Sequence, residues 1–308
     1  MLNVVNLSKS YGAVTALEAI SFRVRPGDIL GVLGPNGAGK TTAIRIIMGI
    51  LRPQSGHVIF DFPEPNGHKQ QRIGYLPEER GLYEDVRVLD NLLYLAQLKQ
   101  VDRFIAREQA ESWLKRFDLW DRAQQRVDQL SKGMQQKVQF IAAVLHAPDL
   151  IILDEPFSGL DPLNQDLFKD IIRELQADGR AILLSAHQME VVEELCDRIF
   201  MVHEGRQVLY GNLTDIKANY PEHIVDLRFP RDIDPAHIRK LCNIRITRDE
   251  PGRIIFRHDG PKSVNDLLGE VARELPLFEV SVRKPPLQEI FVQTARKRGA
   301  SVEDAAIV

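Results

Sequence analysis

The sequence has little cysteine, no excess of basic residues and no long hydrophobic run, and each shortage excludes a class of protein. Only Cys196 and Cys242 are cysteines among 308 residues, too few for a disulfide framework and typical of a reducing compartment. Lys and Arg total 40 against 43 Asp and Glu, so no positive excess is available to hold nucleic acid phosphates. We therefore expect no nucleic acid partner.

No apolar run approaches the roughly 18 residues that cross a bilayer. The first residues, MLNVVNLSKSYG, lack the apolar stretch of a signal peptide. We expect a chain that neither spans the membrane nor is secreted, so that any membrane role comes through a partner. A length of 308 residues suggests about two domains.

Strands alternate with helices over the first two thirds of the chain. The hydrophobic pattern predicts strands at residues 2–7, 20–24, 29–33, 57–62, 149–155 and 180–187, and a hairpin over 196–211 that turns at 204–205. Helices are predicted at 41–51 and 167–179, and residues 86–147 form a helical block between two strands. This alternation is typical of an α/β core.

From about Tyr220 the pattern changes and predicts a second, smaller domain over residues 222–298. Strands are predicted at 224–229, 244–250, 253–258 and 278–283, and helices at 235–242, 263–275 and 286–298. This order indicates a small α+β domain of the split βαβ type. Residues 299–308 are predicted to be a frayed tail.

A phosphate-binding loop follows the apolar strand predicted at 29–33. Residues 34–41, GPNGAGKT, match the pattern G-x-x-x-x-G-K-[ST] between a strand and a helix. Its backbone N–H groups and the positive end of the following helix favour phosphate, so we predict nucleoside triphosphate binding. Lys40 would bridge the β- and γ-phosphates and Thr41 would hold Mg²⁺. The expected nucleotide contacts are Gly34, Pro35, Asn36, Gly37, Ala38, Gly39, Lys40, Thr41 and Thr42.

Two carboxylates end the apolar strand predicted at 149–155. The carboxyl ends of parallel strands are where open α/β sheets bind ligands. Asp154 is therefore predicted to join the Mg²⁺ shell and Glu155 to polarise an attacking water, although both also suit a helix N-terminus. His187 follows a strand at the same edge, and we predict that it contacts the γ-phosphate or this water.

Residues 130–137, LSKGMQQK, resemble the LSGGQ signature of ATP-binding cassette (ABC) ATPases. A Ser-x-Gly before a helix offers a hydroxyl and free N–H groups to an anion, although Ser131 could also be a simple helix cap. Three other segments resemble this family in the expected order. Tyr11 is similar to the residue that stacks on adenine, residues 158–161 are similar to the D-loop that ends in Asp161, and residues 185–187 are similar to the switch histidine segment.

The resemblance covers about residues 1–212 and implies an ATP-binding subunit of an ABC transporter. The implied fold, over residues 1–218, is a P-loop NTPase core with an antiparallel β subdomain and an inserted helical subdomain. Two such domains would pack head to tail around two ATP molecules. The loop 34–41 of one chain would then face the signature residues of the other, which are Ser131, Lys132, Gly133 and Met134. The partner would be a second copy of the chain or a related ATPase subunit.

Three positions depart from the family pattern. Glu78 stands where the family has the glutamine of its Q-loop, and its carboxylate is expected to bind Mg²⁺ together with Thr41 and Asp154. Lys132 replaces the first glycine of the signature, and Met134 replaces its glutamine.

The segment PLQEIF, residues 286–291, resembles the end of an appended domain in ATPases that serve ABC-2 type permeases. This resemblance implies a separate polytopic permease, export of a substrate, and a location on the cytoplasmic side of the cell membrane. An alternative is a soluble ABC ATPase that acts on ribosomes or DNA. A P-loop kinase would leave residues 130–137 unexplained.

Overall fold

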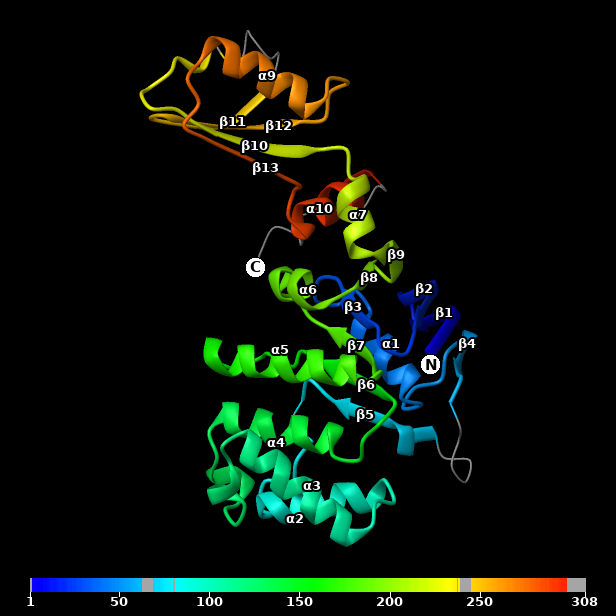
Figure 1. Cartoon of the computed structure of the whole chain (residues 1–308). Helices are drawn as coiled ribbons and strands as arrows, with labels where there is room; N and C mark the ends of the chain where they lie inside the picture. Colours follow the sequence, from blue (N-terminus) through cyan, green and yellow to red (C-terminus); the bar gives the residue numbers. More distant parts are fainter. Residues whose placement is uncertain (1, 63–68, 80, 237, 239–244, 298–308) are drawn as a thin grey trace. The chain divides into compact units, whose positions relative to one another are not determined.

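The structure is a computed structural model that describes residues 2–62, 69–79, 81–236, 238 and 245–297 (Figure 1). The chain divides into two compact units, formed mainly by Met1–Leu213 and by Thr214–Gln293. Each unit has its own hydrophobic core. The domain boundaries expected from the sequence, residues 1–218 and 222–298, stay a prediction.

A six-stranded sheet in the order β5-β6-β7-β3-β8-β9 forms the centre of the first unit. Its strands are β3 (Ile29–Leu33), β5 (Ile73–Leu76), β6 (Leu150–Asp154), β7 (Ala181–Ser185), β8 (Arg198–His203) and β9 (Arg206–Asn212). All pairs are parallel except β8 with β9. Every residue of β3, β6 and β7 is buried, which explains their unbroken apolar runs.

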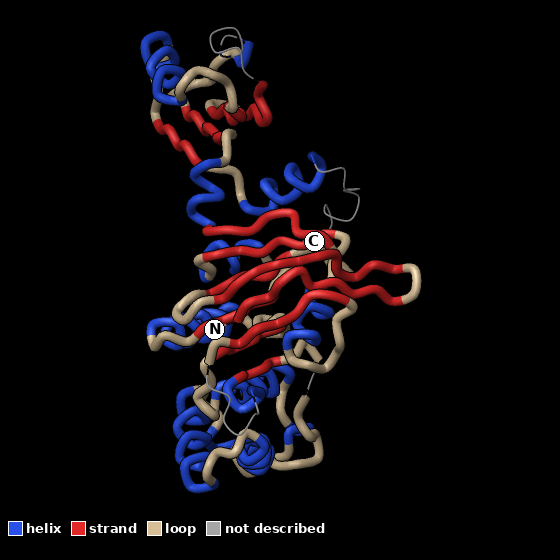
Figure 2. Tube along the Cα trace, turned by 90° about the vertical axis from the view of Figure 1, so that its right-hand side faces the viewer, coloured by secondary structure: helices blue, strands red, loops and turns tan. Residues whose placement is uncertain are grey.

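A second, antiparallel sheet in the order β2-β1-β4 confirms the expected antiparallel subdomain (Figure 2). Its strands are β1 (Leu2–Tyr11), β2 (Val14–Val24) and β4 (Ser55–Phe60). Leu7 and Ile20 of this sheet share one core with Leu30 and Phe200 of the central sheet and Ile44 of α1 (Lys40–Ile47). The two sheets therefore enclose a common core.

Three helices, α2 (Val88–Leu98), α3 (Arg103–Arg116) and α4 (Lys132–Val144), lie together between β5 and β6 in the sequence (Figure 1). They form the predicted helical insert, with short 3₁₀ turns η3 (Trp120–Arg122) and η4 (Val127–Gln129); another turn, η2 (Lys69–Arg72), precedes β5. Helices α5 (Pro162–Ala177) and α6 (Met189–Leu195) complete this unit. The helix predicted at 41–51 is shorter, because the chain leaves helical geometry at Gly49 with a φ of 76°.

The second unit contains a four-stranded antiparallel sheet in the order β11-β12-β10-β13. Its strands are β10 (His223–Arg228), β11 (Arg245–Glu250), β12 (Arg253–His258) and β13 (Glu279–Arg283). It also contains α9 (Val264–Glu274) and most of α7 (Leu213–Asn219) and α10 (Leu287–Lys297). Val225 and Phe256 of the sheet pack with Leu267 and Val271 of α9. The helix predicted at 235–242 and the tail at 299–308 lie largely or wholly outside the described residues.

An aromatic cluster links the helical insert to α5. Phe117, which follows α3, lies 5.8 Å from Phe140 of α4 and 5.5 Å from Phe168 of α5, measured between ring centroids. Phe140 and Phe168 are 4.7 Å apart, and all three side chains are fully buried. Edge-to-face packing at such distances adds to the stability that burial provides. The cluster therefore anchors the insert to the helix that follows β6.

We predict that Phe168→Ala lowers the free energy of unfolding by about 3–5 kcal/mol, because it leaves a cavity among buried rings. Leu163→Ala on the same helix is the control, since Leu163 is 81% exposed and its truncation should cost about 0.5 kcal/mol or less. Urea unfolding of the two variants measures both values. Equal losses would contradict the anchoring role of the cluster.

Candidate functional site

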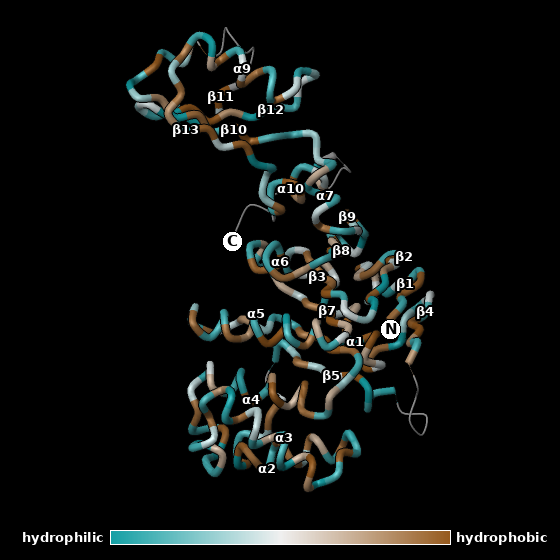
Figure 3. The backbone as a smooth tube through the Cα atoms, in the orientation of Figure 1, coloured by the Kyte–Doolittle hydropathy of each residue, from teal (hydrophilic) through white to brown (hydrophobic). Residues whose placement is uncertain are grey.

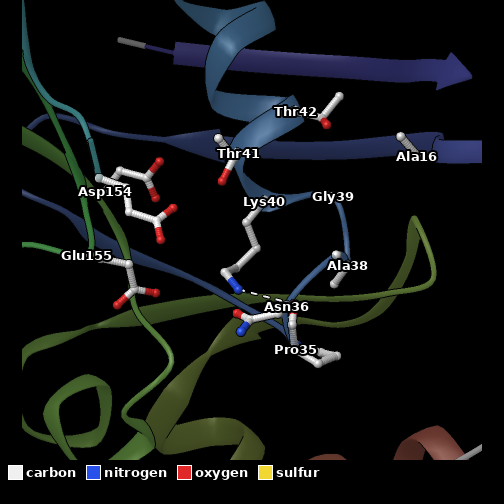
Figure 4. Close-up of a pocket in the computed structure, with 12 residues that line it drawn as sticks. Ala16, Pro35, Asn36, Ala38, Gly39, Lys40, Thr41, Thr42, Asp154 and Glu155 are labelled. Atoms are coloured by element: carbon white, nitrogen blue, oxygen red, sulfur yellow. Dashed lines mark hydrogen bonds between the residues drawn. The ribbon is translucent and has the colours of Figure 1, made fainter. Parts of the chain in front are cut away.

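A cavity of about 340 Å³ opens at the carboxyl ends of β3 and β6 (Figure 4). It is lined by Ala16, Pro35, Asn36, Gly37, Ala38, Gly39, Lys40, Thr41, Thr42, Glu78, Asp154 and Glu155. The predicted phosphate loop, the predicted Mg²⁺ ligands and Glu155 thus meet in one place. Of the predicted nucleotide contacts, Gly34 and Tyr11 are outside this lining.

Close approach of the backbone requires glycine at two positions of the loop. A Cβ on Gly34 would lie 2.2 Å from the carbonyl oxygen of Val202, and one on Gly39 would lie 2.4 Å from that of Ala16. Gly39 also has a φ of 110°, which L side chains rarely adopt. The loop backbone therefore lies close against Val202 of β8 and Ala16 of β2, and α1 begins at Lys40 with its N-terminus at the cavity.

Lys40 is buried, with 7% of its surface exposed, and its ammonium group lies at the cavity. Its Nζ donates a hydrogen bond to the carbonyl oxygen of Gly34 at 2.6 Å. It donates another to the carbonyl oxygen of Pro35 at 3.3 Å (Figure 4). Burial lowers the pKa of Lys40, and the nearby carboxylates of Glu155 and Asp154 oppose this shift. A phosphate group would give the ammonium an anionic acceptor in place of neutral carbonyls, and such charged hydrogen bonds are stronger.

Asp154 is almost completely buried, with 1% of its surface exposed. Its Oδ2 has no hydrogen-bond partner among the described residues. Burial raises the pKa of this carboxyl to about 6, although the neighbouring Ser185 hydroxyl opposes this shift. A buried oxygen without a partner is destabilising unless a ligand satisfies it. The Thr41 hydroxyl and the Glu78 and Asp154 carboxylates line the same cavity, and hard oxygen donors of this kind suit Mg²⁺.

Glu155 and His187 form a pair beside the cavity. The Nδ1 of His187 lies 2.7 Å from Oε2 of Glu155, so the structure brings together two residues that are 32 positions apart. Burial raises the pKa of Glu155, and the His187 ring opposes this shift. Glu155 has a φ of 52°, a backbone conformation that non-glycine residues seldom adopt and that is common at functional sites. Among the described residues, His187 does not line the cavity and reaches it through Glu155.

The remaining predicted residues lie elsewhere on the described chain. Ser131 caps α4, its Oγ accepting a hydrogen bond from the Met134 N–H at 3.3 Å, and Asp161 caps α5, accepting from the Asn164 N–H at 3.0 Å. Tyr11 ends β1, is 49% exposed and has the Lys9 ammonium 5.5 Å from its ring centroid. The signature residues do not line the cavity; they are Ser131, Lys132, Gly133 and Met134.

Two buried glutamines of α4, which were not predicted from the sequence, hold site segments in place. Gln135 Nε2 donates to the carbonyl oxygens of Val127 and Leu130, just before the signature segment. Gln139 Nε2 donates to the carbonyls of Pro77 and Glu79, on either side of Glu78. The sequence does contain a signal for them, because two glutamines four residues apart lie on the apolar face of one helix, where a buried amide needs hydrogen-bond partners. Ala16 was also missed, because its carbonyl reaches the loop only through the folding of β2.

The fold and the cavity together define a P-loop nucleotide-binding protein. A family model described as ABC transporter matches residues 17–158. The uncharacterized ABC transporter ATP-binding protein YhaQ of Bacillus subtilis is 42% identical over 233 residues, covering 76% of this chain and 78% of that protein. The chain therefore belongs to the family of ABC transporter ATP-binding proteins.

Two further similarities support the family at the levels of sequence and fold. The Nod factor export ATP-binding protein I of Burkholderia thailandensis is 34% identical over 265 residues, covering 84% of this chain and 86% of that protein. A solved ATP binding subunit of an ABC transporter aligns with a TM-score of 0.66 at 34% identity, covering 71% of this chain and 92% of that one. The predicted ABC ATPase fold is confirmed. Within the described residues, no helix has the length and apolar character to cross a membrane.

We predict that Asp154→Asn stabilises the chain at pH 7 in the absence of nucleotide and with Mg²⁺ removed by a chelator. The pKa of Asp154 is about 6 in the folded chain against 3.8 for an ordinary aspartate, so the folded chain binds more protons between these values. The free energy of unfolding therefore falls as the pH rises through this window, and removing the charge should restore about 3 kcal/mol at pH 7.

Urea unfolding at pH 7 and pH 3.5 measures this effect, and most of the gain should be lost at the lower pH, where the carboxyl is largely protonated in both states. Asp121→Asn is the control, because Asp121 is exposed and should change little at either pH. A loss of stability in Asp154→Asn at pH 7 would show that the buried carboxylate is satisfied within the chain.

Proposed function

We propose that this chain is the ATP-hydrolysing subunit of an ABC transporter and that it works as a dimer holding two ATP molecules. The observation that carries this proposal is the separation of the signature residues from the cavity within one chain. A second chain supplies the missing half of each site. The Gly34–Thr41 loop of one chain then faces Ser131 and its neighbours on the other, and a homodimer is the simplest arrangement.

Each residue at the site has a role that its position supports. The loop amides and Lys40 bind the β- and γ-phosphates, and Tyr11 stacks on adenine. The donors Thr41, Glu78 and Asp154 hold Mg²⁺, which neutralises phosphate charge when bound. Glu155 accepts a proton from the attacking water, and His187 orients Glu155 through the 2.7 Å contact.

The other motif residues act across the dimer. Ser131 and the exposed N-terminus of α4 offer a hydroxyl and N–H groups to the ATP of the partner. Lys132 adds a positive charge there, and Gly133 and Met134 continue the first turn of the helix. Asp161, in the D-loop, lies at the contact between the two chains. Hydrolysis then lets the chains separate.

We predict that Glu155→Gln binds ATP normally, hydrolyses it at least about 100-fold more slowly, and accumulates as an ATP-bound dimer. Lys40→Ala instead loses ATP affinity and stays monomeric in ATP, because the phosphates lose their cation. Phosphate release and size-exclusion chromatography with light scattering measure both properties. Glu190→Gln, at an exposed glutamate of α6, is the control and should match the original chain. A Glu155→Gln variant with full activity would remove Glu155 from the mechanism.

Exposed hydrophobic side chains on and beside α2 and α3 support docking of a permease on the helical insert. The exposed fractions are 50% for Tyr83, 44% for Tyr94, 59% for Leu98, 69% for Phe104 and 51% for Ile105. The rings of Tyr83 and Tyr94 contact edge to face, with centroids 5.6 Å apart. Large apolar side chains gathered on a surface often mark protein contacts.

The partner in this proposal is a separate polytopic permease of the ABC-2 type, and the complex exports its substrate. The similarity to the Nod factor export protein supports export, and residues 286–291 support the ABC-2 type. The chain then lies on the cytoplasmic side of the membrane, attached through the permease. A soluble ABC ATPase acting on ribosomes or DNA is the competing function, and the net charge of −3 weighs against it.

Affinity purification of the tagged chain from detergent-solubilised membranes tests this proposal. We predict recovery of one stoichiometric polytopic protein, and a clear loss of it in Leu98→Asp and Phe104→Asp with ATPase activity retained. Ile50→Asp is the control, since Ile50 is 61% exposed but lies outside the helical insert. Recovery of ribosomes or DNA in place of a membrane protein would favour the competing function, a soluble ABC ATPase that acts on ribosomes or DNA.

A further inference from the structure

The two edges of the C-terminal sheet differ in how they are protected. The β11 edge carries a register shift between Ile246 and Arg248, and its exposed residues are polar or charged. Bulges and charges of this kind prevent a strand from pairing with another chain. The β13 edge pairs with β10 in one unbroken register, from Arg228 opposite Glu279 to Ile224 opposite Arg283. All five residues of β13 are exposed.

Alternate positions of the β13 edge carry exposed apolar side chains. Phe278 is 75% exposed, and Val280 and Val282 are each 40% exposed. Val280 and Val282 stand opposite Leu227 and Val225 of β10, so they lie on the face that carries the hydrophobic core. Figure 3 shows hydrophobic, brown stretches on both strands. The hydrophobic face of the sheet is therefore incompletely covered at β13. The unpaired backbone N–H and C=O groups of this edge strand can pair with a further strand.

The order of residues in β13, Glu-Val-Ser-Val-Arg, is complementary to itself. When two copies pair antiparallel about Ser281, Glu279 stands opposite Arg283 of the other copy, and Val280 stands opposite the other Val282. We propose that the β13 edge binds the β13 edge of a second copy of this chain, joining the two C-terminal sheets. The contact is isologous, with its two-fold axis at Ser281.

The charges needed for this pairing are available at the edge. Arg283 is exposed and attracts the carboxylate of Asp226, which is already held by Arg253 at 2.6 Å, so its guanidinium can also meet a carboxylate from outside. Glu279 lies 3.0 Å from Arg228, but both side chains are about half exposed, so a carboxylate oxygen can also meet an arginine from outside. Placing like charges opposite each other in a sheet is destabilising, so this edge selects the one register that alternates their sign.

This inference goes beyond the ATP-dependent dimer proposed above, because strand pairing requires no nucleotide. Five residues bury little surface, so we expect the isolated contact to be weak. Measurements without ATP therefore test the β13 contact alone. An ATP-dependent dimer of Glu155→Gln, measured separately, tests the proposed function, so that either can fail without the other.

Cysteine crosslinking of the full chain tests the pairing directly. We expect Ser281→Cys, made with Cys242 replaced by serine, to form a covalent dimer under mild oxidation without ATP, because the two residues 281 face each other across the axis. Thr247→Cys on the protected β11 edge is the matched control, since Thr247 is also exposed and lies in an edge strand. We expect it to give at most a tenth of this yield.

Charge exchange in the Ser281→Cys background separates specific pairing from chance collision. Glu279→Arg alone and Arg283→Glu alone should each reduce the crosslink at least about fivefold, since two like-charge pairs then face each other. Mixing these two variants should restore the yield, because the introduced arginine of one chain then meets the introduced glutamate of the other. No crosslink at residue 281, a yield equal to that of Thr247→Cys, or a mixture no better than its components would overturn the proposal.

Discussion

The close approach of three backbone segments at the phosphate loop is the constraint on which the site depends. Side chains are excluded at Gly34 and Gly39 because the carbonyls of Val202 and Ala16 stand where a Cβ would lie, 2.2 and 2.4 Å away. The loop can therefore curl over the end of β3 and point the first turn of α1 into the cavity. Both sheets contribute to this arrangement, since Val202 belongs to β8 and Ala16 to β2.

Charge balance in the cavity follows from this geometry. Three carboxylates, those of Glu78, Asp154 and Glu155, share it with the single ammonium of Lys40. Glu78 contributes the third carboxylate, where the family has an amide. In the proposed function a triphosphate adds further negative charge, so we expect ATP binding here to depend on a divalent cation more strongly than at a site with one carboxylate fewer. The buried, unpartnered oxygen of Asp154 is suited to meet that cation.

Local patterns predicted most of the fold, the phosphate loop and the carboxylates of the cavity. The buried runs of β3, β6 and β7 and the turn at Glu204 and Gly205 follow from hydropathy and backbone preference, so the sequence was sufficient for them. The rule that parallel strands end at one edge placed Glu155 and His187 at the same edge, but their direct 2.7 Å contact was not predicted; the expected contact of His187 was the γ-phosphate or the attacking water. Four-residue β5 and seven-residue α6 and α7 were too short to show a period.

What the sequence did not predict depends on contacts between distant segments. The carbonyl of Ala16 and the amide of Gln139 act on loops 23 and 60 or more residues away, and no local pattern encodes such a meeting. Lys40 presents another case, because its hydrogen bonds to the loop carbonyls exist only once the loop has curled. The edge of β13 belongs to the same class, since a strand becomes an edge only through sheet order.

The central claim is that each ATP site is shared by two chains, and a mixing experiment tests it most directly. Lys40→Ala spoils the phosphate loop and Ser131→Arg spoils the signature, so each variant alone should hydrolyse no ATP. A mixed dimer contains one site with both halves intact. We expect equal mixtures to regain activity that neither variant has alone, because every mixed dimer has one working site. Mixtures as inactive as their components, or a Ser131→Arg variant active by itself, would contradict the shared site.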